Sequence, residues 1–236
     1  MYRALSSLLF AAALTTTLPI AADSPGDEPI DIRADSGRFD GGQGATRLSG
    51  NVLIARGETQ VSADEGYAFQ GDDRSYERFE LEGDPATWRA IDEEGVEIHG
   101  RAGRIVYEVA NNRATLSGGV RIERGELVVE ADSGQALQVE GRYERIELDG
   151  TPARWSTVTE EGRRVEGESD RIIHDLLAEQ VVMVGNARVR EPRGSFSGQR
   201  LLYDLNTQAT EGEGGIHMII DPEAIDERGD NGQLDQ

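Results

Sequence analysis

The sequence predicts an all-β protein that is built from copies of one unit. Apolar and polar residues alternate in short runs, as in Gly119–Gly125, where Val120 and Ile122 fall two residues apart. That period is typical of a half-buried strand. Turn signals separate such runs every 8–12 residues or so, as in sandwiches and barrels. The one stretch that resembles a helix, His174 to Val182, is interpreted as a strand pair because of the repeat described next.

The chain contains an internal repeat of about 67 residues. Leu48–Gln70 and Leu116–Gln138 are identical at 14 of 23 positions, with an offset of 68. Tyr76–Gly118 and the segment 67 residues later are identical at 16 of 43 positions, and both contain Gly-x-Pro-Ala-x-Trp. A third, partial copy begins at Gly185. Units of this kind stack along one axis and bury a continuous core.

The repeat predicts which apolar side chains share one surface. Residues at equivalent positions keep one face of their strand, so the copies together line an inner surface along the whole protein. The glycines between them are expected in turns and bulges that bend the strands. Six such positions are Val52, Ile54, Ile105, Val120, Ile122 and Ile172.

Four segments follow one another along the chain. Residues 1–22 have one base near their start, Arg3, followed by an uncharged apolar run that ends in two alanines. This pattern predicts a cleaved signal peptide. An uncleaved membrane anchor is the alternative, because the run approaches the spanning length of about 20 residues. Residues 23–28 are predicted to be a flexible lead, 29–222 the β-rich body, and 223–236 a disordered acidic tail.

Composition and motifs argue against several functions. The 236 residues carry a net charge of −21, contain no cysteine and have arginine as their only strong base. This balance disfavours nucleic-acid binding, and the absence of cysteine excludes disulfides and thiolate metal sites. The three histidines are isolated, and Gly194–Gly198 has phenylalanine where a serine nucleophile would stand. We therefore expect no catalytic residue, no metal and no cofactor.

Several motifs resemble the OstA-like family of lipopolysaccharide-transport proteins. They are Gly-Asn-Val-x-Ile at Gly50, Ala-Asp at Ala63, Gly-x-Pro-Ala-x-Trp at Gly83 and Leu-Ser-Gly at Leu116. The resemblance extends from Pro29 to Pro222. It implies an open β-jellyroll, a V-shaped stack of antiparallel strands whose hydrophobic groove carries acyl chains. The chain departs from the shortest family members in holding one more unit.

The resemblance also implies site residues. It places lipid contacts at Ile30, Ile32, Trp88, Tyr107 and Val109, and the repeat extends them to later copies. With the repeat-matched positions, the predicted groove residues are Ile30, Ile32, Val52, Ile54, Trp88, Ile105, Tyr107, Val109, Val120, Ile122, Trp155, Ile172, His174 and Leu176. The alternative for all of them is the plain core of a closed sandwich.

A function follows from the same resemblance. It implies a periplasmic carrier that bridges the inner and outer membranes and binds lipopolysaccharide through its acyl chains. The implied partners are the membrane components of the transport machinery, joined by edge-strand addition, and further copies joined head to tail. Three alternatives stay open, namely a structural β-repeat protein or adhesin, a glycan-active β-helical enzyme, and a membrane-anchored relative in the same transport system.

Overall fold

The computed structural model describes residues 29–221 except 41–43, 73–74, 93 and 140–141. The predicted signal peptide, lead and tail lie outside the described residues. Every regular element of the described part is a strand, which confirms the all-β prediction. No helix there has the length and apolar character that crossing a membrane requires.

Fourteen strands follow one another, most of them 11 to 17 residues long. Their bounds are β1 Asp31–Arg33, β2 Ser36–Asp40, β3 Ala45–Arg56, β4 Thr59–Gln70, β5 Tyr76–Ile91, β6 Glu97–Glu108, β7 Arg113–Arg124, β8 Leu127–Val139, β9 Arg142–Val158, β10 Arg164–Asp175, β11 Gln180–Glu191, β12 Gly194–Asp204, β13 Thr210–Glu213 and β14 His217–Ile220.

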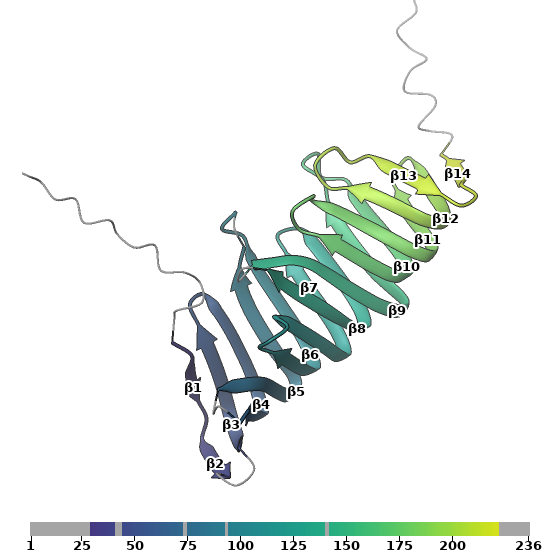
Figure 1. Cartoon of the computed structure of the whole chain (residues 1–236). Helices are drawn as coiled ribbons and strands as arrows, with labels where there is room; N and C mark the ends of the chain where they lie inside the picture. Colours follow the sequence, from purple (N-terminus) through teal and green to yellow (C-terminus); the bar gives the residue numbers. More distant parts are fainter. Residues whose placement is uncertain (1–28, 41–43, 73–74, 93, 140–141, 222–236) are drawn as a thin grey trace, which may run out of the picture.

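All fourteen strands form one antiparallel sheet that does not close (Figure 1). Strands β3 to β12 pair in sequence order, so each repeat copy supplies four neighbouring strands. The short strands β1 and β2 both pair with β3, and β13 and β14 both pair with β12. His174 to Val182 spans the end of β10 and the start of β11, as predicted. The open β-jellyroll is therefore confirmed.

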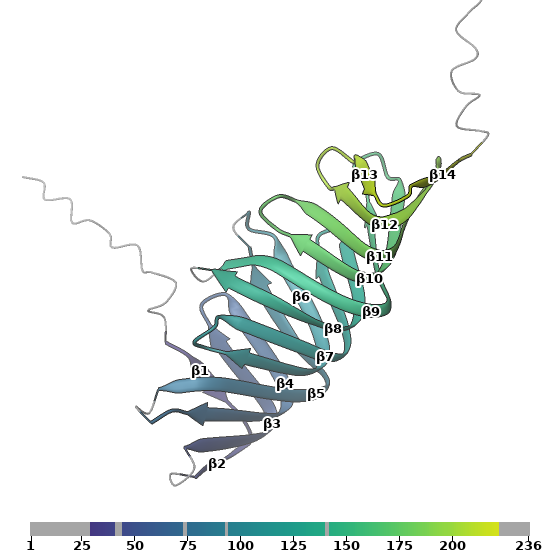
Figure 2. The ribbon, with the colours of Figure 1, turned by 45° about the vertical axis from the view of Figure 1, so that its right-hand side comes forward.

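The sheet is folded lengthwise along a crease at the middle of its long strands (Figure 2). Every pairing between β3 and β12 shifts register there, for example between Ser49 and Val52. Such bulges bend a strand sharply. We call the half of the sheet that contains Trp88 and Trp155 the tryptophan leaf, and the half that contains Leu48 and Leu116 the leucine leaf.

Residues with left-handed backbone form the crease in β3, β7 and β11. Gly50 and Asn51 have φ angles of 77° and 46°, and Gly185 and Asn186 have 79° and 50°. Glycine and asparagine tolerate this conformation better than other residues. In β5 and β9 the crease is the Gly-x-Pro segment, where Oδ2 of Asp132 accepts hydrogen bonds from the backbone N and the Oγ1 of Thr151 at 3.1 and 3.0 Å. The repeated motifs of the sequence are thus the bending points of the strands.

Candidate lipid-binding interior

One row of apolar side chains crosses the whole inner face of the tryptophan leaf. Successive members are directly opposite one another on neighbouring strands, from Ile32 on β1 to Met218 on β14. Twelve strands at about 4.8 Å spacing give the row a length of roughly 50 Å. The tryptophan row is Ile32, Ile54, Val61, Trp88, Gly100, Ile122, Val129, Trp155, Gly167, Val189, Phe196 and Met218.

A second unbroken row crosses the leucine leaf. It runs from Gly37 on β2 to Gly212 on β13, and each long apolar member is less than 10% exposed. The leucine row is Gly37, Leu48, Gly66, Leu81, Ile105, Leu116, Gly134, Leu148, Ile172, Met183, Leu201 and Gly212. The interior therefore has an apolar wall on each side along its full length.

Glycine in the tryptophan row makes room for each indole. Trp88 lies opposite Gly100, and Trp155 lies opposite Gly167. A Cβ at Gly100 would lie 1.9 Å from Cζ2 of Trp88, and one at Gly167 would lie 1.9 Å from Nε1 of Trp155. Each indole ring thus lies over the backbone of the glycine on the next strand. The tryptophan and its opposite glycine together fill the space that two ordinary side chains would fill.

The two leaves are in direct contact at Trp155. Its Nε1 donates a hydrogen bond to Sδ of Met183 at 3.1 Å, and its ring centroid lies 4.9 Å from that of Tyr203. Trp155 is 2% exposed. One copy earlier the residue at the position of Tyr203 is Ala136, which has no ring, and Trp88 is only half-buried. The interior is therefore filled in the C-terminal half and less so in the N-terminal half.

An ion-pair cluster joins the tips of the two leaves opposite the crease. Arg124, at the end of β7 on the tryptophan leaf, contacts Oδ2 of Asp92 at 2.6 Å and Oε2 of Glu94 at 2.8 Å. Its Nη1 donates a hydrogen bond to Oε2 of Glu179 at 3.1 Å, in the β10–β11 turn of the leucine leaf. Burial raises the pKa of the Glu179 carboxyl. We call Arg124, Asp92, Glu94 and Glu179 the latch.

A weaker contact joins the leaf tips further along. Nη2 of Arg163, in the β9–β10 turn, donates a hydrogen bond to Oε1 of Gln208 at 2.7 Å. Gln208 lies between β12 and β13, so this contact also links the two leaves. In both cases the tips that meet are about three strands apart in the sheet, which follows from the twist of the leaves.

His174 lies near the end of β10 on the leucine leaf, close in sequence to Glu179 of the latch. It is 3% exposed, and its Nε2 has no hydrogen-bond partner among the described residues. Burial, aided by the charge of Arg124, lowers the pKa of its imidazole to about 4, while Asp175 opposes the shift. The residue is therefore neutral at physiological pH. Tyr107, at the equivalent position one copy earlier, donates a hydrogen bond to Oδ1 of Asn112 at 3.2 Å.

The structure places all of the predicted groove residues except Ile30 in four groups. Ile32, Ile54, Trp88, Ile122 and Trp155 belong to the tryptophan row, and Ile105 and Ile172 belong to the leucine row. Val52 and Val120 lie next to the crease, while Tyr107, Val109, His174 and Leu176 lie near the tips of the leucine leaf. Ile30 precedes β1 and is 40% exposed.

Burial differs among these residues. Val52, Ile105, Val120, Ile122, Trp155, Ile172, His174 and Leu176 are at most 9% exposed, whereas Ile32, Ile54, Trp88, Tyr107 and Val109 are half-buried. Apart from the polar His174, the buried members belong to one hydrophobic core cluster. The half-buried members gather in the N-terminal half of the interior.

Sequence reasoning missed the latch. Arg56 and Arg124 occupy equivalent positions in the repeat, and this conserved spacing is a signal within the sequence. The partner Glu179 is 55 residues away, and nothing in the local pattern around either residue points to the other. Glu94 belongs to this cluster although its side chain is 65% exposed.

The sheet ends in two unpaired edges. At the C-terminal edge, Met218, Ile219 and Ile220 are 50–57% exposed. The backbone N of Asp221 donates to the carbonyl of Arg193 at 3.0 Å. Backbone groups alternate in direction along an antiparallel strand, so the amides of Met218 and Ile220 face away from β12. These two groups are donors available to a further strand.

The N-terminal edge is formed by β1 and β2, which together cover both halves of β3. Phe39 on β2 is 62% exposed. In the described part of the chain, no group of three or more His, Asp or Glu side chains is arranged to hold a metal ion. The chemistry that the interior offers is apolar contact.

Comparison with known proteins identifies relatives. Lipopolysaccharide export system protein LptA of Escherichia coli (strain K12) is 25% identical over 130 residues, which are 54% of this chain and 70% of that protein. Lipopolysaccharide export system protein LptH of Pseudomonas aeruginosa is 25% identical over 158 residues, 66% of this chain and 86% of that protein. The crystal structure of LptH, described as the LptA homologous periplasmic component of the lipopolysaccharide transport device, covers 84% of this chain and 99% of its own, with 15% identity and a TM-score of 0.32.

A family model matches the chain twice, at residues 31–118 and 110–209. Its description is LptA/(LptD N-terminal domain) LPS transport protein. The two matches together cover most of the chain and confirm the resemblance to the OstA-like family. The chain belongs to the LptA/LptD N-terminal domain family of lipopolysaccharide transport proteins.

Proposed function

We propose that the protein is a periplasmic carrier that binds the acyl chains of lipopolysaccharide and passes them along its interior between the inner and outer membranes. The observation that carries this proposal is the pair of unbroken apolar rows on the two leaves. Family membership supports the substrate, and the relatives LptA and LptH are named as lipopolysaccharide export proteins.

An acyl chain needs a continuous apolar path to cross an aqueous compartment. Each buried CH₂ group contributes about 0.8 kcal/mol, so an acyl chain of roughly twelve carbons resists exposure to water by about 10 kcal/mol. A row of apolar side chains along the whole protein keeps the acyl chain in apolar contact at each step, so that the full cost of exposure to water never arises at once. The energy for directional movement comes from another component, because apolar contacts alone have no direction.

Acyl chains would enter where the interior is least filled. Trp88 and Ile54 are half-buried, whereas Trp155 packs against Met183 and Tyr203. Passage beyond the first copy then requires the two leaves to separate at Trp155. The latch and the Arg163–Gln208 contact would have to lengthen or break as the leaves part.

The two edges supply the proposed route to partners. Exposed strand edges pair with strands of other proteins. The outward amides of β14 fit the edge formed by β1 and β2 of a following copy, which gives a head-to-tail, extendable assembly. The same edges would accept inner-membrane and outer-membrane components of the transport machinery. No cofactor is part of this proposal.

Photocrosslinking in cells tests the proposal. A photoreactive residue at Trp88 faces the interior, and one at Thr87, its neighbour on β5, is exposed on the opposite face. We expect Trp88 to crosslink to lipopolysaccharide and Thr87 not to. Equal crosslinking at both positions would contradict transport through the interior and favour a structural protein with a filled core.

A further inference from the structure

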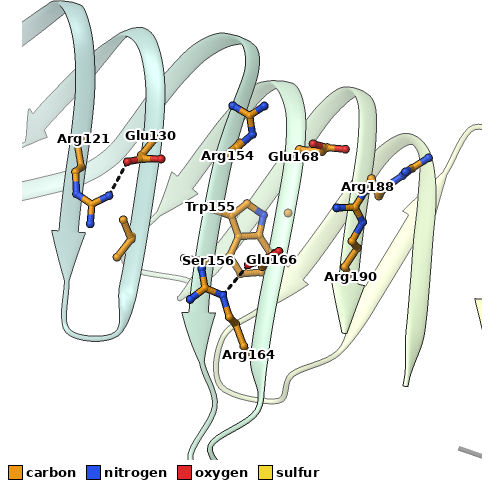
Figure 3. Close-up of a pocket in the computed structure, with 12 residues that line it drawn as sticks. Arg121, Glu130, Arg154, Trp155, Ser156, Arg164, Glu166, Glu168, Arg188 and Arg190 are labelled. Atoms are coloured by element: carbon orange, nitrogen blue, oxygen red, sulfur yellow. Dashed lines mark hydrogen bonds and ion pairs between the residues drawn. The ribbon is translucent and has the colours of Figure 1, made fainter. Parts of the chain in front are cut away.

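The outer face of the tryptophan leaf has a charged concavity near its C-terminal end. It has a volume of about 330 Å³ and extends over strands β7 to β11 (Figure 3). Five arginines and three glutamates line it, on a chain whose net charge is −21. These side chains are Arg121, Arg154, Arg164, Arg188, Arg190, Glu130, Glu166 and Glu168.

Three of the five arginines have no carboxylate partner. Arg121 contacts Glu130, and Arg164 contacts Glu166, each at 2.6 Å. In the described part of the chain, no carboxylate lies within ion-pair distance of Arg154, Arg188 or Arg190, and Figure 3 shows them without such contacts. All three are exposed. Five arginines against three glutamates leave an excess of two positive charges in this lining, and Glu168 is directly opposite both Arg154 and Arg188 on the neighbouring strands.

The first repeat copy lacks this cluster. A concavity of about 270 Å³ lies on the same face there. Its Arg89 is paired with Glu97 at 3.0 Å, and Thr87 stands where the later copy has Arg154. Glu123 stands at the position of Arg190. The arginines at positions 154 and 190 are therefore particular to the later copy and are not part of the repeat as such.

Strand β14, which precedes the acidic C-terminal segment in the sequence, lies beside this concavity. Arg190 lies opposite Ser195 on β12, and Ser195 lies opposite Ile219 on β14. Two strand spacings, roughly 10 Å, separate Arg190 from β14. Residues 222–236 contain five carboxylates and one arginine. Fifteen residues reach up to about 50 Å, far beyond the distance needed.

We propose that Arg154, Arg188 and Arg190 form a docking site for the acidic C-terminal segment 222–236 of the same chain. Single exposed ion pairs are weak, but three guanidinium groups facing several carboxylates act together. Attachment through β14 keeps the segment at a high effective concentration. Docking holds the segment on the outer face, clear of the free edge of β14. The inference is independent of lipid transport.

A single-lysine crosslinking experiment tests the proposal, because the chain has no lysine of its own. Arg190→Lys places one amine in the concavity, and a carbodiimide joins it to carboxylates in direct contact. Arg101→Lys, on the same face in the first copy, is the matched control. A mixture of heavy and light isotope-labelled protein separates crosslinks within a chain from those between chains, and circular dichroism checks the fold of each variant.

We expect crosslinks within the chain from Arg190→Lys to peptides of 222–236, about fivefold above those from Arg101→Lys, and a strong decrease in 0.5 M salt because exposed ion pairs are screened. Adding Arg154→Gln and Arg188→Gln should reduce them further. Crosslinks only to Glu166 and its neighbours would overturn the proposal. Crosslinks that join heavy to light chains would overturn it too, and would assign the site to the segment of a second copy.

Discussion

The side-chain amide of Asn186 donates a hydrogen bond across the crease to Oδ2 of Asp170, at 2.9 Å. Asn51 makes the same bond to Asp35 at 2.8 Å in the first copy. In the middle copy both partners are glycine, at Gly103 and Gly119. The two positions thus differ together between copies: where the asparagine is replaced by glycine, so is the aspartate that accepts its hydrogen bond.

Two substitutions separate the backbone role of Asn186 from its hydrogen bond. Asn186→Ala loses the bond and places a Cβ-bearing residue without local support at φ 50°, so we expect the free energy of unfolding to fall by about 1–2 kcal/mol. Asn186→Gly loses only the bond and should cost about half as much. Urea denaturation measures both. Equal losses for the two variants would contradict the backbone role.

The indole of Trp155 requires glycine on the next strand. Gly167→Ala should lower the free energy of unfolding by about 3 kcal/mol and shift the tryptophan fluorescence, because the ring must move away from the new Cβ. Gly162→Ala is the control. Its φ is +75° and no atom lies within 4 Å of the new Cβ, so only the backbone strain of about 1 kcal/mol is expected. Similar losses would show that the ring is not held as described.

His174 makes stability depend on pH. The imidazole pKa is about 4 in the folded protein and 6.5 in the unfolded chain. As pH falls below 6.5, the unfolded chain takes up a proton that the folded protein refuses until about pH 4, so stability decreases over this window. The full loss, reached below pH 4, is on the order of 3 kcal/mol. Relative to wild type, His174→Gln should lose less stability between pH 6.5 and 4, measured by urea denaturation at each pH. Parallel curves would contradict the assignment.

The latch should respond to removal of its central cation. Arg124→Gln leaves Asp92 and Glu179 facing each other at 13–16% exposure, and we expect the free energy of unfolding to fall by about 2 kcal/mol. Amide hydrogen exchange in the β10–β11 turn should accelerate as the leaf tips separate. Arg163→Gln, at a more exposed contact between the leaves, is expected to cost less than about 1 kcal/mol.

A double variant checks that the latch residues act on one another. The losses of Arg124→Gln and Glu179→Gln should add to more than the loss measured for both together. Strict additivity would mean that the two residues do not stabilise the contact between the leaves.

Edge pairing is tested at β14. The amide of Met218 faces away from β12, so Met218→Pro removes a donor for a following strand and leaves the pairing with β12 in place. Met218→Ala keeps that donor and is the control. We expect sedimentation to show weaker self-association for Met218→Pro than for Met218→Ala, with unchanged circular dichroism. Equal self-association of the two variants would contradict pairing through the edge of β14.

The strands and their inner faces were predictable from the sequence because they depend on local pattern. Alternation places Val120 and Ile122 on one face, and the 67-residue offset carries that assignment to the equivalent residues of each copy. Short Gly-rich turns then force neighbouring strands to pair. The row from Ile32 to Met218 is the direct product of these two regularities.

Contacts between the leaves were not predictable in the same way. Trp88 and Trp155 occupy the same motif, yet only Trp155 is fully buried, because Tyr203 faces it where Ala136 stands one copy earlier. Likewise Arg124 meets Glu179 only because the leaf tips are staggered by about three strands. Stagger arises from twist and bulge geometry summed over many residues, and no local motif encodes it.

The register of the two rows has an evolutionary consequence. Four strands after Ile54 and Leu48, the equivalent residues Ile122 and Leu116 lie on the same inner face. Duplication of one copy would therefore lengthen the protein by about 19 Å, without altering its cross-section or either terminal edge. Length is thus a property that gene duplication adjusts in whole steps, so the reach of a single subunit is set by the number of copies it contains.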